Sequence, residues 1–272
     1  MRILLCLFIL IGSLSSCSIF GKKGDSFSKA MKSTDYDYKL RMAEKYYIKK
    51  DYNHAQQLYD DLFRVMKGTD HFEDIYYKYA YCSFYLKDYQ SAENLFKGFV
   101  EAFPNSPKAE EMEYMRAYSF FKESPKAELD QTNTTKSIGF LQAFVSTHPG
   151  SDRVKEAQEH IEEGRVKLEK KEFESALLYY DLEFYRASAL VFNGLMNSFP
   201  ESLRSDEYKL YIVKANYKYA GVSTEDKKYV RLEQVITDCN DFIDRFPDSK
   251  FRKDVEVYLN LSKNTIKSYK NE

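Results

Sequence analysis

Several absences in this 272-residue sequence narrow the class of protein that it encodes. It has only ten Gly and six Pro and no Trp, and no segment alternates apolar and polar residues as a half-buried β-strand does. The formal net charge is -1, with both signs spread along the chain, so no strong field would attract nucleic acid or anionic lipid. We therefore expect an all-α protein, built as one continuous series of helices, with no nucleic-acid partner.

The sequence also lacks the motifs of catalysis and metal binding. There is no Gly-rich phosphate loop, no nucleophile elbow and no isolated pair of carboxylates in an apolar setting. The histidines are scattered without the paired spacing of a metal site, and they are His54, His71, His148 and His160. Cys82 and Cys239 lie far apart and are expected to be small core residues instead of a disulfide. We expect no enzymatic activity, no cofactor and no metal ion.

The stretch from residue 76 to residue 106 has the pattern of two helices joined by a tight turn. Apolar residues recur at helical spacing, pause at Lys87-Asp88, and resume until Pro104, which cannot continue a helix. Small Ala80 and Ala92, twelve residues apart, would lie where the two helices approach most closely. The order small, small, Phe, Pro resembles that of the tetratricopeptide repeat.

The ending of this hairpin recurs along the chain. Four copies share an apolar residue, three variable residues, Phe or His, Pro, one variable residue and Ser, and they are Phe99–Ser106, Phe144–Ser151, Leu195–Ser202 and Phe242–Ser249. A fifth, weaker copy precedes them, because Ala43 and Ala55 repeat the spacing of Ala80 and Ala92. One hairpin cannot bury its apolar face alone, so neighbours must stack on it. We expect a right-handed tetratricopeptide-like α-solenoid of five helical hairpins plus a C-terminal capping helix.

The expected repeats differ in their details. Their ranges within 35–272 are 35–72, 73–107, 108–151, 152–203 and 204–250, followed by the terminal helix. The third has a longer connector around Ser124–Gln131, and the fifth has the same excess near Gly221–Lys228. The fourth should open with a long helix that tolerates Gly164. Its close-packed position in the second helix is either Ala187 or Ser188, because the turn selects one and the proline selects the other.

Residues 1–16 have the form of a secretory signal peptide. Their apolar run, residues 3–11, is too short to span a bilayer. The sequence Leu14-Ser-Ser-Cys17 is similar to the cleavage box of bacterial lipoproteins, in which the lipidated Cys becomes the first mature residue. This predicts lipid attachment at Cys17 and a lipidated tether over 17–34, and the alternative is an ordinary signal with an incidental cysteine. Ser18, in place of Asp, implies an outer-membrane anchor that faces the periplasm.

The 24 Tyr and 20 Phe exceed what the seams of a solenoid require, so some should line a surface. If Ala80 and Ala117 mark the closest helix approach, the concave face lies three residues before, one after and four after each of them. The six aromatic residues at those positions are Tyr77, Tyr81, Phe84, Tyr114, Tyr118 and Phe121. They predict a groove for extended substrate segments, since a Tyr ring offers an apolar face and a hydroxyl. The alternative is that these rings pack between repeats, and burial would distinguish the two.

Together, the signal, the repeats and several segments resemble the BamD family, lipoproteins of the machinery that assembles β-barrels into the bacterial outer membrane. The segments that carry this resemblance are Lys32–Tyr36, Glu110–Tyr118, Ser124-Pro125 with Leu129–Gln131, and Leu178–Glu183. The resemblance covers essentially the whole mature chain.

The resemblance implies a scaffold of the β-barrel assembly machinery. Its C-terminal repeats would bind the periplasmic domains of the barrel-forming subunit, and its N-terminal repeats would meet unfolded outer-membrane β-barrel proteins before folding and insertion. The alternative is another tetratricopeptide envelope lipoprotein, one for nutrient capture or cell-wall coordination. An enzyme would need a catalytic constellation assembled from distant repeats.

Overall fold

The computed structural model describes residues 26–269, and every regular element in that range is an α-helix. These helices form two compact units, one ending at Asp88 and one beginning at Tyr89, and each is described by itself. The expected signal peptide at 1–16 and the lipid site at Cys17 lie outside the described residues. No helix in the described part is long and apolar enough to cross a membrane.

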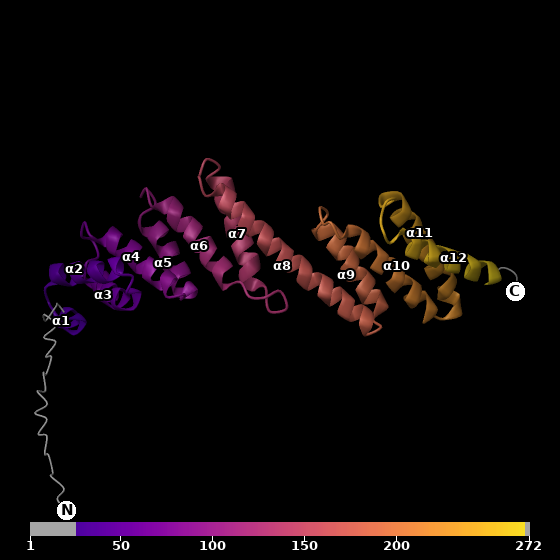
Figure 1. Ribbon diagram of the computed structural model, residues 1–272, viewed down its shortest axis with the longest axis horizontal. Helices are drawn as coiled ribbons and strands as arrows, with labels where there is room; N and C mark the ends of the chain where they lie inside the picture. Colours follow the sequence, from indigo (N-terminus) through magenta and orange to yellow (C-terminus); the bar gives the residue numbers. More distant parts are fainter. Residues whose placement is uncertain (1–25, 270–272) are drawn as a thin grey trace, which may run out of the picture. The chain divides into compact units, whose positions relative to one another are not determined.

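In the described part of the first unit, the helices pack against one another in series. Its helices are α1 (Phe27–Lys32), α2 (Tyr36–Ile48), α3 (Tyr52–Val65) and α4 (Phe72–Tyr85). Helix α3 packs against both α2 and α4 (Figure 1). Asp35 and Asp51 start α2 and α3, because their carboxylates accept hydrogen bonds from the backbone N–H groups of Tyr38 and His54. Ala43 and Ala55 are fully buried, as the repeat spacing predicts.

Helix α1 occupies part of the segment that the sequence predicts as a tether. Phe27, Ala30 and Met31 lie at helical spacing, and this short apolar face packs on the core of the first unit. Buried Lys39 fixes the end of α1, because its Nζ donates to the backbone O of Met31 at 3.1 Å and to Asp61 at 2.7 Å. Residues 27–32 of the expected tether are therefore helical and packed on the core of the first unit.

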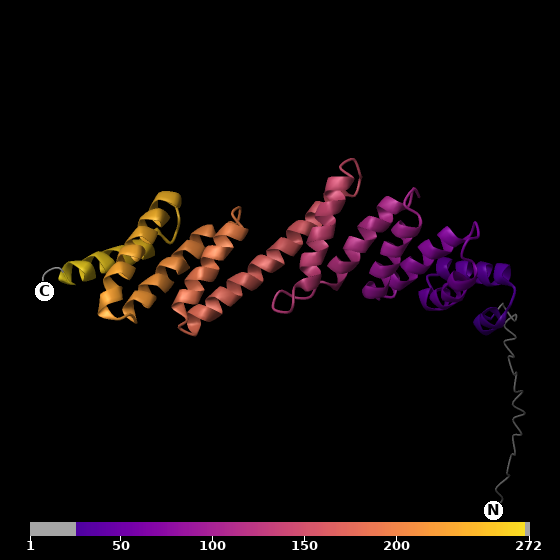
Figure 2. The same ribbon diagram turned by 180° about the vertical axis from the view of Figure 1, so that it is seen from behind.

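In the second unit, the helices follow one another in chain order (Figures 1 and 2). Its helices are α5 (Tyr89–Ala102), α6 (Ala109–Glu123), α7 (Thr132–Thr147), α8 (Val154–Asp181), α9 (Tyr185–Ser198), α10 (Ser205–Gly221), α11 (Glu225–Arg245) and α12 (Arg252–Tyr269). Each helix packs against the next, and α12 also contacts α10. These serial hairpins make the described chain a tetratricopeptide-like helical solenoid, and its fold is all-α as the sequence predicts.

Serine takes the place of alanine where two helices approach closely in the second unit. The buried hydroxyl of Ser137 in α7 donates to the backbone O of Ala117 in α6 at 3.1 Å. Ser188 in α9 donates in the same way to the backbone O of Ala176 in α8 at 2.9 Å. The close-packed position of α9 is therefore Ser188, as the proline register predicts, and Ala187 lies beside it.

The recurring Pro-x-Ser sequence is a turn that ends one helix and starts the next. In the turn before α10, the backbone N of Ser202 donates to the O of Phe199, and the Ser202 hydroxyl accepts from the N of Arg204. The same two bonds recur in three further turns, at Ser106, Ser151 and Ser249. Proline fits the second position of such a turn because its φ is fixed there. The repeated motif therefore marks the boundary between repeats.

The opposite kind of turn, inside a hairpin, uses a residue with positive φ. Lys50, Lys87 and Glu183 have φ values of 60°, 64° and 63° and follow the C-termini of α2, α4 and α8. Such a left-handed residue ends a helix by satisfying its last carbonyl groups. The glycine at position 164 of α8 has a different reason, which is close packing. A Cβ at this position would lie 2.9 Å from the side chain of Ile138 in α7, so a larger residue would clash.

The connectors expected in the third and fifth repeats have different outcomes. Residues 124–131 form an extended loop, which Gln131 holds by donating to the backbone O of Lys126 and Leu129. Near Gly221, in contrast, only three residues separate α10 from α11, and the additional residues lengthen α11 itself. Thr224 stands at the N-cap of α11, but its side chain makes no capping hydrogen bond.

Candidate interaction surfaces

The first three residues of the predicted aromatic groove lie on α4 in the first unit. The rings of Tyr77 and Tyr81 are 4.8 Å apart, and Tyr81 contacts Tyr85 in turn. Tyr85 stacks on Tyr52, the first residue of α3, at 4.4 Å. Tyr81 is buried, whereas Tyr77 and Phe84 are half-buried and Tyr85 is exposed. The first unit thus carries a row of tyrosines in contact with one another, of which Tyr81 is buried and Tyr85 is exposed.

The other three groove residues lie on α6 in the second unit, where they face α8. Tyr118 and Phe121 both stack on the ring of His160, with ring centres 5.0 and 4.2 Å away. Both remain half-buried. Tyr114 is only 1% exposed, and its ring packs against Phe144. Burial raises the pKa of the Tyr114 hydroxyl above its usual range.

Burial therefore divides the six predicted groove residues. Tyr114 is a packing residue between helices, so its replacement would destabilise the fold instead of reporting on a ligand. Tyr118 and Phe121 retain exposed edges next to His160. The two triplets belong to separate units, so each triplet stands as a surface of its own unit.

A shallow groove of about 250 Å³ lies between α5 and α7, with α6 at its base. We call it the α5–α7 groove, and it is lined by Lys97, Val100, Glu101, Glu113, Arg116, Phe140, Ala143, Phe144 and Thr147. Its charges are paired: Arg116 donates to Glu93 at 2.9 Å and lies over the Phe140 ring at 4.2 Å. Glu113 contacts His148 at 2.7 Å, and Lys97 and Glu101 are 3.7 Å apart. This groove offers an external partner little unpaired charge.

A second groove, of about 230 Å³, lies on the corresponding three helices two repeats later, but near the opposite end of those helices. We call it the α9–α11 groove, and it is lined by Arg186, Ala189, Leu190, Asn193, Asn216, Tyr219, Arg231 and Gln234. Arg186 is exposed and has no ion-pair partner within residues 26–269. The hydrogen bonds of Arg231 go to the neutral hydroxyls of Ser223 and Tyr219, and its guanidinium lies 3.7 Å from the Tyr219 ring centre. Leu190 is 63% exposed beside these two cations.

A buried ion cluster supports the base of the α9–α11 groove. Asn216, on the groove floor, donates to Asp238 at 2.8 Å. The other oxygen of Asp238 accepts from Lys209 at 3.0 Å, and Lys209 also contacts Asp241 at 2.8 Å. The side chains of Lys209 and Asp238 are only 8% and 10% exposed. The cluster therefore fixes α10 against α11 and orients the amide that faces the groove.

The α9–α11 groove cannot be recognised in the sequence, because its residues come from three different helices. Arg186, Tyr219 and Arg231 have no short-range spacing in common, and each alone is an ordinary helix residue. The available sequence signal is Leu190, an apolar residue outside the buried positions of its helix. Among the described residues, no group of three or more His, Cys, Asp and Glu could hold a metal ion.

Serial helical hairpins with open grooves on their faces define a tetratricopeptide-like helical repeat protein. Residues 38–232, well over half of the chain, match the family model YfiO, described as outer membrane lipoprotein. The chain belongs to this family.

Known proteins similar to this chain include a relative and a solved structure. A protein of Aquifex aeolicus (strain VF5), named as the outer membrane protein assembly factor BamD, is 24% identical over 227 residues, which are 82% of this chain and 73% of the relative. The solved TPR2AB domain of yeast Sti1, in a complex with pHSP90, is 14% identical with a TM-score of 0.39, covering 87% of this chain and 86% of that one.

Proposed function

We propose that this protein is a lipid-anchored scaffold subunit of the machinery that assembles β-barrels into the outer membrane, facing the periplasm. Membership of an outer membrane lipoprotein family and similarity to a protein named as an assembly factor support this role. The observation that carries the scaffold role is the α9–α11 groove, in which two arginines flank an exposed leucine and have no carboxylate partner in the described part of the chain. Unpaired cations beside apolar surface are suited to binding another protein.

The barrel-forming subunit binds, through its periplasmic domains, to the C-terminal half of the chain at the α9–α11 groove. Deleting residues 204–272 removes α10 to α12 and with them the groove floor. The truncated protein should fail to co-purify with the barrel-forming subunit from solubilised membranes. Because solenoid stability is nearly a nearest-neighbour sum, the helices before α8 should stay folded, which circular dichroism would verify. Undiminished co-purification would place the docking surface elsewhere.

Unfolded barrel proteins bind to the half-buried aromatic surfaces. The sharper test replaces exposed-edge residues only, so we choose Tyr77→Ala together with Tyr118→Ala and leave Tyr114 unchanged. A labelled peptide that ends in an aromatic residue should bind several-fold more weakly to this variant. As a control, Tyr114→Ala should lower thermal stability, because truncating a buried large aromatic costs about 3–5 kcal/mol. Equal peptide binding by the wild type and the double variant would refute the aromatic surface.

Lipid at Cys17 anchors the protein. Two or three acyl chains hold a protein firmly, because each buried CH₂ contributes about 0.8 kcal/mol. The Cys17→Ser variant should accumulate as unprocessed precursor, as membrane fractionation and mass spectrometry would reveal. Mature-sized Cys17→Ser protein in the outer membrane would contradict this assignment.

A further inference from the structure

Two clefts flank the turn between α9 and α10, at the end of these helices that lies away from the α9–α11 groove. Arg186, at the start of α9, and Phe199, after its end, are separated by about 20 Å along the helix at 1.5 Å per residue. The upstream cleft, of about 410 Å³, is lined by Ile161, Glu162, Arg165 and Glu169 of α8 and by Phe199, Glu201 and Ser202. The downstream cleft, of about 310 Å³, is lined by Ser202, Leu203, Ser205, Asp206, Arg245, Phe246, Pro247, Asp248 and Ser249.

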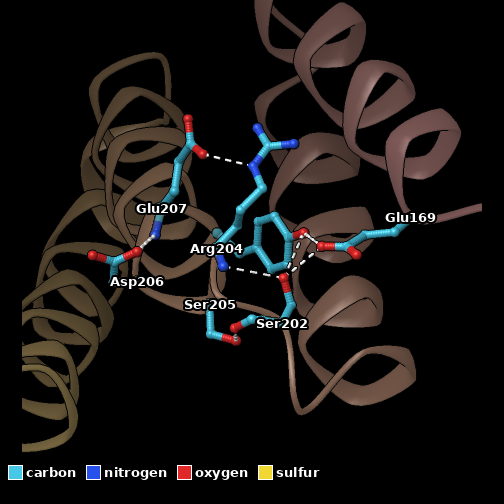
Figure 3. A network of polar contacts seen from close by, with 7 residues as sticks. Glu169, Ser202, Arg204, Ser205, Asp206 and Glu207 are labelled. Atoms are coloured by element: carbon cyan, nitrogen blue, oxygen red, sulfur yellow. Dashed lines mark hydrogen bonds and ion pairs between the residues drawn. The ribbon is translucent and has the colours of Figure 1, made fainter. Parts of the chain in front are cut away.

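A polar network holds the wall between the two clefts in place. Glu169 accepts hydrogen bonds from the hydroxyls of Ser202 and Tyr208. Figure 3 shows its carboxylate directed at Ser202 from α8. Tyr208 is fully buried. This burial, and to a smaller extent the hydrogen bond to Glu169, raises the pKa of its hydroxyl to about 12. On the other side of the turn, Ser249 donates to Asp206 at 2.7 Å. The turn is thus fixed to the first helix of its own repeat and to the next turn.

The same turn motif gives each cleft one unpaired carboxylate. Glu201 and Asp248 occupy the position between Pro and Ser in their turns, and neither has a hydrogen-bond or ion-pair partner within residues 26–269. The equivalent residues of the two earlier turns are Asn105 and Gly150, which carry no charge. The acidic residue is therefore specific to the two turns that form these clefts.

Each cleft also has one aromatic ring in its wall, and the guanidinium group of an arginine of the protein lies beside that ring. The Arg165 guanidinium lies 5.9 Å from the Phe199 ring centre, and that of Arg245 lies 5.4 Å from the Phe246 ring centre. The upstream cleft has three carboxylates and one guanidinium, and the downstream cleft has two carboxylates and one guanidinium. Both therefore carry net negative charge beside an aromatic ring, a combination that favours a planar cation. Leu203, between them, is 100% exposed.

We propose that this edge binds an extended polypeptide segment that places one arginine in each cleft and an apolar side chain against Leu203. Glu201 and Asp248 pair with the two guanidinium groups, and Phe199 and Phe246 provide the surfaces on which these groups stack. Packed helices lie about 8–10 Å apart, and an extended chain advances about 3.3 Å per residue, so the two arginines are about three residues apart. This surface is separate from the docking groove of the proposed function, and its test requires no assembly partner.

The test uses the purified mature chain and the fluorescent peptide Gly-Ser-Arg-Leu-Ser-Arg-Ser-Gly. Fluorescence anisotropy should show binding that weakens as the salt concentration rises, because the contact is between exposed charges. The variant Glu201→Gln with Asp248→Asn should bind at least about tenfold more weakly. Both residues are exposed and lie outside the polar network, so its melting temperature should not change.

Two controls identify the chemistry. Glu172→Gln, on the exposed surface of α8 but outside both clefts, should bind within about twofold of the wild type. A peptide with citrulline in place of both arginines keeps the shape but loses the charge, and it should bind no better than the double variant does. Equal binding of the citrulline peptide, or unchanged binding by the double variant, would overturn the proposal. So would calcium binding that depends on Glu201 and Asp248 without selectivity for the arginine peptide, since that would identify a metal-ion site.

Discussion

The α5–α7 and α9–α11 grooves lie on corresponding helices of the repeat series but near opposite ends of them, and they differ in whether their arginines are paired with carboxylates. Arg116 in the first groove is neutralised by Glu93 at 2.9 Å, and both side chains are largely covered. Arg186 in the second groove is exposed without an ion-pair partner, and Arg231 donates only to hydroxyls. A paired charge stabilises the contact between its own helices, whereas an unpaired charge remains available for a partner. The two grooves thus differ in the pairing of their cations, and we expect only the α9–α11 groove to offer unpaired cations to a partner.

The largest expected effect concerns the ion cluster below the α9–α11 groove. Lys209→Met leaves Asp238 and Asp241 without their cation, and breaking a buried pair from one side costs about 3–5 kcal/mol. Urea unfolding should register that loss. The matched control Lys218→Met, at an exposed position on the same helix, should change the free energy of unfolding by less than about 0.5 kcal/mol. Equal stabilities of the two variants would show that the cluster does not support the groove.

Reversing the charge of one residue in each groove should show which groove binds the partner. Arg186→Glu should weaken binding of the periplasmic domains of the barrel-forming subunit by about 10- to 100-fold, or about 1.4–2.8 kcal/mol, because it replaces an unpaired cation with an anion. Titration calorimetry would measure the change. Lys97→Glu in the α5–α7 groove is the matched control and should bind nearly as the wild type does. A larger effect from Lys97→Glu would reverse our assignment of the two grooves.

The α5–α7 groove should become able to bind an acidic partner when the carboxylate that pairs with Arg116 is removed. Glu93→Gln leaves Arg116 without its carboxylate, at a cost of about 1 kcal/mol in stability because the pair is partly screened by solvent. The freed guanidinium should then bind a glutamate-bearing peptide weakly, which chemical-shift changes in an NMR titration would detect. Identical chemical-shift changes in the wild type and the variant would contradict the proposed difference between the two grooves.

The smallest expected effect uses Cys239, a buried residue of α11 beside Asp238. Burial raises the pKa of its thiol from the ordinary 9.0 to about 12. The thiol should therefore resist a thiol reagent at pH 8 in the folded protein and react fully in urea. Since the folded-state pKa is the higher one, its stabilising contribution is complete below pH 9 and is lost as the pH rises from 9 toward 12. Rapid labelling of native protein at pH 8 would show that α11 opens locally.

Local sequence patterns predict the hairpins well, because each depends on residues close together in the chain. The Pro-x-Ser motif locates the turns before α6, α8, α10 and α12, and each serine hydroxyl accepts from the backbone two residues later. The spacing from the proline also identifies Ser188 as the close-packed residue of α9. The length of α11 is not predictable in this way, since a short apolar-poor stretch reads equally as loop or as exposed helix.

The interaction surfaces follow a different rule. The sequence determines by itself that this chain forms an all-helical repeat series, because helical periodicity, proline stops and small residues act over one or two turns. Only the tertiary structure decides that Tyr114 is buried while Tyr118 keeps an exposed edge, since burial depends on the neighbouring helix α8. It also decides that Arg116 has a carboxylate partner and that Arg186 has none among the residues that the structure describes, because ion pairs form between helices whose residues are far apart in the sequence.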